Sequence, residues 1–185
     1  AVDVTVELQQ MSETIQDLRL QADSEISAYV NEINEITANI DQLNDDIISN
    51  GTVGRDVTDL RDQRDGQIDR LAELVDIRYF FRNDGDAAVF TSGGRTIADT
   101  IPPELSHTAA ASMTPTSTHA EGNISGIYVG TAIESNDMTD EIREGVLKAL
   151  IDMRDEILPN IQSQIDELAV EMRDMVNQIH NQGVA

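Results

Sequence analysis

Residues 30–47 read VNEINEITANIDQLNDDI, and the spacing of their apolar side chains decides the fold. These side chains recur every three or four residues, at Ile33, Ile36, Ile40, Leu43 and Ile47. That spacing places them along one side of an α-helix and leaves Asn and acidic residues on the other sides. The pattern begins at Leu8, with an average step close to that of a coiled-coil seam. It predicts one long helix, which we expect Gly51 and Gly54 to end.

The positions between the apolar stripe are strongly acidic, and we expect their side chains, including Asp17, Asp23 and Glu25, on a solvated face. The whole chain has 35 acidic and 12 basic residues, a formal net charge of −23. Such a surplus repels nucleic acid and anionic membrane surfaces, so neither is an expected partner. No apolar run is long enough to span a membrane, and the first residues lack the basic and apolar blocks of a signal, so we expect no cleavable signal.

Two later segments repeat the helical pattern. Residues from about Asp56 to Val75 predict a second helix, and the short turn before it makes the first two helices antiparallel neighbours. From about Asp137 the period returns and predicts a third helix that runs to the end. Pro159 lacks an amide donor and disfavours helical geometry at Leu158, so we expect a kink or short break there.

Between these helices the pattern alternates, as in β-strands. Residues 77–82 and 87–91 flank the turn sequence Asn83-Asp84-Gly85 and predict a β-hairpin, and a last strand is expected from Asn123 to Val129. The predicted fold class is mainly α with a small β insert (α+β). We expect an elongated antiparallel helical bundle or coiled coil of three long helices, the third kinked near Pro159. Its helical rod comprises residues 1–76 and 136–185, and the β-rich insert residues 77–135.

No catalytic, metal or cofactor pattern emerges. The chain has no Cys, and His107, His119 and His180 are far apart and lack the His-Glu-x-x-His spacing of a zinc helix. The turn at Asn83 lacks the closing Glu of a calcium loop, and no phosphate-binding P-loop is present. We therefore expect neither an enzyme nor a cofactor.

Several polar residues are candidates for setting helix register or for interaction. Arg64 stands where the second apolar stripe predicts a hydrophobe, inside the sequence DLRDQRD of residues 59–65. Its cluster either fixes the register between helices or forms a solvated charged face. The Asn residues either hydrogen-bond across the bundle or face water, and His180 is expected to cap the last helix. The complete set is Asn31, Asn34, Asn44, Arg61, Asp62, Arg64, Asp65, Asn177 and His180.

Three blocks of this sequence resemble the FlgK family, the hook-associated proteins of the hook–filament junction in bacterial flagella. Residues 30–47 are similar to that family's V-x-x-I-N-x-I-x-x-I-x-x-L-N-x-x-I helix. Residues 59–65 resemble its D-L-x-D-Q-R-D helix, with Arg61 at the variable position. Residues 145–183 resemble its closing segment, including Pro159 and an N-x-x-H-x-x-G end. The resemblance covers most of the chain outside about 100–122.

The resemblance implies an elongated helical domain with a β-rich insert between the flexible hook and the rigid filament. It implies an extracellular place in the flagellum, reached through the flagellar secretion apparatus without a cleaved signal. The implied partners are neighbouring copies of the chain and the adjoining hook and filament-side junction proteins. In that family the outermost terminal segments polymerise the subunits. This chain is expected to lack them and to be a monomer in isolation.

A second hypothesis comes from a different class of protein. The chain could be the extracellular ligand-sensing helical bundle of a chemoreceptor, with a small molecule bound by the insert. Such a receptor has membrane-spanning helices beyond both ends and a pocket lined by Arg or aromatic side chains. An enzyme is a third class, which no motif supports.

Overall fold

The structure, a computed structural model, describes residues 2–183 and the side chains of residues 4–182. Its elements in chain order are α1 (Val2–Thr52), α2 (Thr58–Leu74), β1 (Ile77–Phe81), β2 (Ala87–Thr91), β3 (Thr96–Ala98), β4 (Leu105–Ser106), β5 (Tyr128–Val129), η1 (Glu134–Asn136), η2 (Thr139–Glu141), α3 (Val146–Asp152), η3 (Met153–Ile157) and α4 (Leu158–Gly183). Here η1 and η2 are 3₁₀ turns and η3 is a π-helical turn. The prediction of a mainly helical chain with a small β insert is confirmed.

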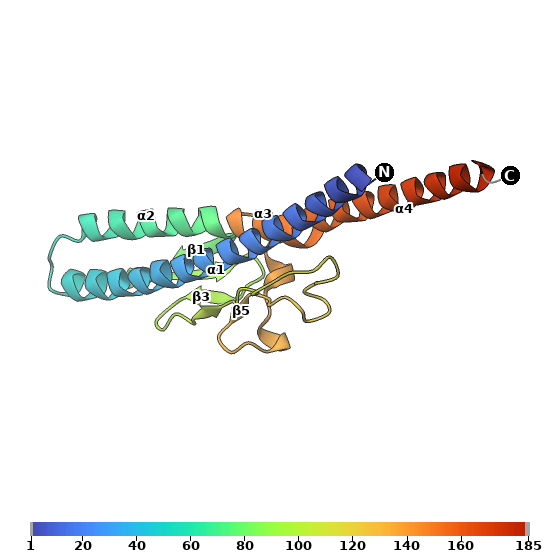
Figure 1. Cartoon of the computed structure of the whole chain (residues 1–185). Helices are drawn as coiled ribbons and strands as arrows, with labels where there is room; N and C mark the ends of the chain where they lie inside the picture. The colour runs from blue at the N-terminus through green and yellow to red at the C-terminus, as the bar shows by residue number, and fades with distance from the viewer. Residues whose placement is uncertain (1, 184–185) are drawn as a thin grey trace.

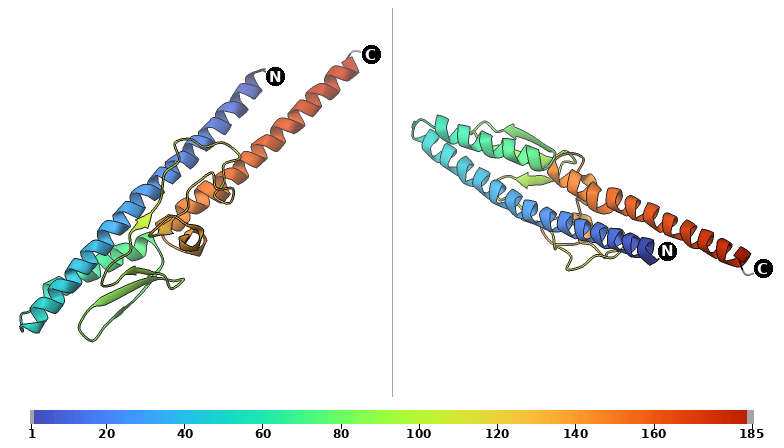
Figure 2. Two further views of the ribbon diagram at one scale, coloured as in Figure 1. Left: turned by 90° about the horizontal axis from the view of Figure 1, so that it is seen from below. Right: turned by 45° about the horizontal axis from the view of Figure 1, so that its top comes forward.

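Helix α1 is the axis of the molecule. Helix α2 runs antiparallel along the C-terminal part of α1, whereas α4 runs along its N-terminal part (Figure 1). Two further views agree that both chain ends lie at the same end of the rod (Figure 2). The expected coiled coil of three long helices is therefore not confirmed, because α2 and α4 use successive stretches of α1. None of the described helices is long and apolar enough to cross a membrane.

The core is aliphatic, as the apolar stripe predicts. Ile26, Ile33 and Ile40 of α1 are fully buried in one cluster with residues of α2, α3 and the three-stranded sheet. Burying each such side chain contributes about 1.5–3 kcal/mol. A smaller cluster at Ile15 and Ile165 joins α1 to α4. Helix α1 therefore contributes side chains to both clusters.

The β insert contains two small antiparallel sheets. The predicted hairpin is confirmed: β1 pairs with β2, from Ile77 opposite Thr91 to Phe81 opposite Ala87. Strand β3 follows on the other side of β2, so β1 is an edge strand. Of the strand expected from Asn123 to Val129, only β5 pairs, and it pairs with β4.

The third helix begins later than its sequence pattern predicts. Residues 137–145 contain a 3₁₀ turn and extended backbone, although Met138 and Ile142 are buried with helical spacing. The reason is the close approach at Gly145, which has a φ of 92° and whose added Cβ would lie 2.6 Å from the Leu74 carbonyl oxygen. Only after this crossing can the chain turn into α3.

An irregular turn lies directly before Pro159, where a kink or short break is expected. In η3 the Leu158 N–H donates to the Met153 carbonyl, one residue farther back than in an α-helix. Pro159 follows in α4 and has no N–H to donate to the preceding turn, whose Arg154 carbonyl accepts from Arg19 Nε over 2.8 Å. The turn also buries Arg154 completely.

The crossing at Gly145 gives a stability prediction. Gly145→Ala forces a left-handed φ on an L-residue and pushes its Cβ into the Leu74 backbone, so we expect a loss of about 2–4 kcal/mol in the free energy of unfolding. The matched control is Gly66→Ala in α2, where nothing lies within 4 Å. This control should gain about 0.5–1 kcal/mol. Urea denaturation followed by circular dichroism measures the unfolding free energy of both variants. Equal changes in the two variants would contradict a close backbone approach at Gly145.

Candidate functional site

Two asparagines of α1 hold the β insert by its backbone. The Asn44 side chain donates Nδ2–H to the Ala87 carbonyl and accepts the Ala87 N–H at Oδ1, both over 3.0 Å. Asn34 does the same to Leu105, with distances of 2.8 and 2.7 Å. We call these two contacts the amide clamps. Each satisfies both backbone groups of a residue that is buried. The clamps therefore attach β2 and β4 to α1 at fixed positions along the helix axis.

Arg64 of α2 joins the clamp at Asn44. Its guanidinium Nη1 donates to Asn44 Oδ1 over 3.2 Å and to the Gly85 carbonyl over 2.6 Å. The guanidinium carbon also lies 4.5 Å from the centre of the Phe81 ring, a cation–π distance. Burial lowers the pKa of Arg64, with Asp65 opposing the shift. One buried arginine thus connects α1, α2 and the hairpin turn.

A second polar site lies at the other end of the insert. We call its residues, Arg19, Asp23, His107, Arg154 and Asp155, the charge cluster. Arg154 Nη1 donates to Asp23 Oδ1 over 2.6 Å, and both side chains are completely buried. The remaining guanidinium edge of Arg154 pairs with Asp155 over 2.9 and 2.6 Å. Asp23 also accepts the Ala110 N–H over 2.6 Å.

Arg19 ties the charge cluster to its surroundings through backbone carbonyls. Its Nε donates to the Arg154 carbonyl over 2.8 Å, and its Nη2 donates to the Ser117 carbonyl over 2.6 Å. A third bond reaches the Thr114 carbonyl over 3.1 Å. Arg19 thereby holds both η3 and the loop around residue 115 against α1.

The pKa shifts in the charge cluster follow from its pairing. Burial alone would raise the pKa of Asp23, but His107, the Ala110 N–H and Arg154 outweigh burial and lower it. Burial also works against the charge on Arg154, yet Asp155 and Asp23 raise its pKa. Both groups are therefore ionised in the folded chain, which is how buried charges are tolerated.

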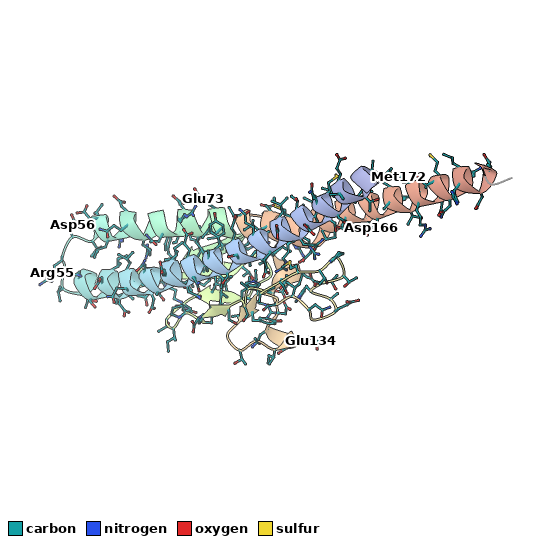
Figure 3. All side chains as sticks on the ribbon, viewed as in Figure 1. Arg55, Asp56, Glu73, Glu134, Asp166 and Met172 are labelled. Carbon is teal, nitrogen blue, oxygen red and sulfur yellow. The ribbon has the colours of Figure 1, made fainter. Side chains whose placement is uncertain are left out.

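The structure brings together three of the nine candidate residues. Asn34, Asn44 and Arg64 lie between the helices and the insert, whereas Asn31, Arg61, Asp62 and Asp65 are exposed. Asn177 and His180 are exposed on α4. Asn177 lines an apolar groove between α1 and α4, where Figure 3 labels Asp166 and Met172.

The expectation of a solvated Asp23 is wrong. The loop of residues 107–126 folds over this face of α1 and buries it, a contact that helical periodicity does not report. Sequence analysis also missed the roles of Arg19, His107 and Arg154. The available signal was the i, i+4 pair of Arg19 and Asp23. Among the described residues, no group of three or more His, Cys, Asp or Glu could hold a metal ion.

The amide clamps predict unequal effects for two asparagines on the same helix. Asn44→Ala leaves the Ala87 N–H, the Ala87 carbonyl and one Arg64 donor unpaired, so unfolding free energy should fall by about 2–4 kcal/mol. Asn31→Ala, at an exposed position, should change it by less than about 0.5 kcal/mol. Urea titration compares the two variants, and a harmless Asn44→Ala would contradict the clamp.

The charge cluster predicts an acid dependence. Because the pKa of Asp23 lies below its ordinary value of 3.8, the stability it contributes is present above about pH 4 and is lost as pH falls through the folded pKa. Asp23→Asn should cost about 3–5 kcal/mol at pH 6. The difference in unfolding free energy between this variant and the unmodified chain should become smaller below pH 4. Thermal unfolding across this range measures it, with exposed Asp17→Asn as the control. A constant gap would refute the assignment.

Known proteins with a similar sequence and structure are flagellar. The family model described as the flagellar hook-associated protein FlgK helical domain matches residues 1–185. Flagellar hook-associated protein 1 of Bacillus subtilis (strain 168) is 25% identical over 198 residues, covering 94% of this chain and 38% of the relative. The solved flagellar hook junction protein FlgK from Burkholderia pseudomallei matches with a TM-score of 0.65 and 26% identity. That match covers 89% of this chain and 28% of the solved one.

The chain thus spans well under half the length of these two relatives. Both are flagellar proteins, so the alternative of a chemoreceptor sensing bundle is not supported. The match of the family model extends over every residue, insert included. The chain therefore belongs to the flagellar hook-associated protein FlgK helical domain family.

Proposed function

We propose that the chain is a structural part of the bacterial flagellum, within a junction protein that joins the flexible hook to the rigid filament. Its family, and its similarity to the flagellar proteins of Bacillus subtilis and Burkholderia pseudomallei, support this proposal. The observation that carries it is the buried polar attachment of the insert to α1 by the amide clamps and the charge cluster. Such attachment makes helices and insert move as one body, as a coupling between two lattices requires.

The proposed mechanism is geometric. Asn34, Asn44 and Arg64 set the register of α1 and α2 against the insert, because a shift of either helix would leave buried donors and acceptors unpaired. The rod then transmits torque without slipping along its length. Arg61, Asp62 and Asp65 are exposed and remain available for contact with neighbouring molecules. Asn177 and His180 of α4 are likewise exposed and available for such contacts.

Two exposed apolar surfaces are the proposed contacts with neighbouring copies and with the adjoining junction proteins. Tyr79, Phe80 and Phe81 on edge strand β1 are each about half exposed (51%, 51% and 49%). The second surface is the far part of α4, where Met175 and Ile179 are exposed by 61% and 65%. We base this proposal on the grouping of large exposed hydrophobes at these two places.

The isolated chain is proposed to be a monomer. Each surface is small, and repulsion between copies of charge −23 opposes association. We further propose that residues 77–135 act as an insert carried by the rod of residues 1–76 and 136–185. The whole protein would be exported by the flagellar secretion apparatus without a cleaved signal and would act outside the cell.

The functional test is deletion of the whole gene that encodes this chain, followed by complementation. Cells without the gene should assemble hooks but carry no attached filaments, and the unmodified gene should restore them. Electron microscopy of the cell surface counts both structures. Normal filament numbers in the deletion strain would contradict the proposed junction role.

The same strain tests the strand β1 surface. Phe80→Asp should reduce filament attachment and swimming radius several-fold, because it places a charge in a proposed apolar contact while the folded core stays intact. Glu121→Gln, exposed on the loop before β5, is the control and should swim normally. Circular dichroism of the isolated chain checks that both variants fold. Normal swimming with Phe80→Asp would remove β1 from the junction contacts.

A further inference from the structure

The two edges of the three-stranded sheet are built differently. Strand β3 forms one edge, has three residues, and changes register with β2 between Val89 and Phe90. Its Ile97 and Ala98 side chains are fully buried, and α1 lies against it. Strand β1 forms the other edge, with five residues in unbroken register with β2. Short, irregular and covered edges resist pairing with a further strand, so β3 is protected and β1 is not.

The hydrogen bonds that flank β1 show which of its backbone groups face outward. At the turn, the Arg82 N–H donates to the Asp86 carbonyl oxygen over 2.7 Å. At the other end, the Ser92 N–H donates to the Asp76 carbonyl oxygen over 3.1 Å. Alternate residues of an antiparallel strand bond to the same neighbour, so the even-numbered residues of β1 bond to β2. The outward N–H and carbonyl groups therefore belong to the odd-numbered residues, Ile77, Tyr79 and Phe81.

The outward backbone groups are open at Tyr79 and Phe81. Within the described part of the chain, no group bonds to the main-chain N–H or carbonyl of either residue. Both side chains are about half exposed, as is that of Phe80 between them. The strand contains neither Pro nor Lys, two residues that discourage pairing at exposed edges. The edge thus offers two free donors and two free acceptors with the spacing that an added strand requires.

The charges beside β1 indicate the chemistry of an added strand. Near the turn, two carboxylates already neutralise Arg82. At the start of the strand, Arg78 is exposed and makes no ion pair with any described residue. Arg143 is also exposed, and its N–H donates to Asp76 Oδ1 over 3.1 Å, which places its backbone beside this end of β1. Its guanidinium has no carboxylate partner among residues 4–182. Two unpaired cations therefore favour a strand that carries carboxylates here.

We propose that β1 binds an extended acidic segment of an adjoining junction protein as a fourth strand of the sheet. The inference rests on the proposed junction role and specifies the partner of the β1 surface. The segment bonds to the outward backbone groups of Tyr79 and Phe81 and directs carboxylates to Arg78 and Arg143. Salt screens the more distant charges of this chain beyond about 8–10 Å, so the two arginines act on a short segment locally. A second copy fits less well, because its own edge strand carries Arg78 and no acidic residue.

The test separates backbone pairing from side-chain contact by complementation of the deletion strain. Tyr79→Pro and Tyr79→Thr both remove the ring, but only proline removes the outward N–H. Tyr79→Pro should leave several-fold fewer attached filaments than Tyr79→Thr, because the added strand loses a hydrogen bond. Amide exchange in the isolated chain checks folding, since the Ala88 and Phe90 N–H groups bond to β1 and should stay protected. If Tyr79→Pro does not fold, Phe81→Pro and Phe81→Thr repeat the comparison at the other outward N–H.

The charge of the partner is tested at Arg78, which is exposed and unpaired, so its replacement leaves the core intact. Arg78→Glu should reduce filament attachment several-fold more than Arg78→Gln, because glutamate repels the carboxylates of the added strand. This pair of variants does not depend on whether β1 accepts a proline.

The outcomes distinguish the inference from the junction role. Equal filament numbers for the proline and threonine variants, or for the two Arg78 variants, would overturn the acidic fourth strand and leave the junction role standing. A dimer of the isolated chain in sedimentation, dissociated by Tyr79→Pro, would assign the edge to a second copy instead. Normal filaments in the deletion strain itself would overturn the junction role together with the inference that rests on it.

Discussion

Every polar group that α1 buries needs a partner, and the rest of the structure depends on this constraint. Asn34, Asn44, Arg19 and Asp23 lie on one helix, yet their partners come from strands, loops and a π-helical turn far along the chain. An unpaired buried group costs about 1–3 kcal/mol, more if it is charged. The insert therefore has one favourable position on the rod. Apolar packing alone would not specify it, because an aliphatic surface tolerates sliding.

The same contacts oppose bending of the helical rod. Helix α1 is shared by α2 at one end and α4 at the other, and each end has its own apolar cluster (Figure 1). The charge cluster lies where α1 meets η3, which is the irregular turn before Pro159. A π-helical turn is a natural place for a long helix to bend. By pairing Arg154 with Asp23, the chain ties this turn to α1 and limits bending where it would be easiest.

The sequence predicts local features well and distant contacts poorly. The stripe from Leu8 to Ile47 and the turn Asn83-Asp84-Gly85 are local signals, and both elements form. Asn34, Asn44 and Arg64 were identified as polar residues near apolar stripes, but their strand partners depend on how the insert folds back. Asp17 and Asp23 look alike in the helical pattern, and only a loop 87 residues farther along, at Ala110, separates them. The start of α3 was misplaced because buried Met138 and Ile142 have helical spacing by chance.

Native-state hydrogen exchange at two amides tests most directly whether rod and insert form one body. The Ala87 and Leu105 N–H groups are the protons that the amide clamps bind. If rod and insert open together, both amides exchange only through global unfolding. Their free energy of opening then equals that of the core amides of Ile33 and Ile40. Exchange at Ala87 and Leu105 with a clearly lower free energy than in the helix would contradict it, because the insert would then detach while the rod stays folded.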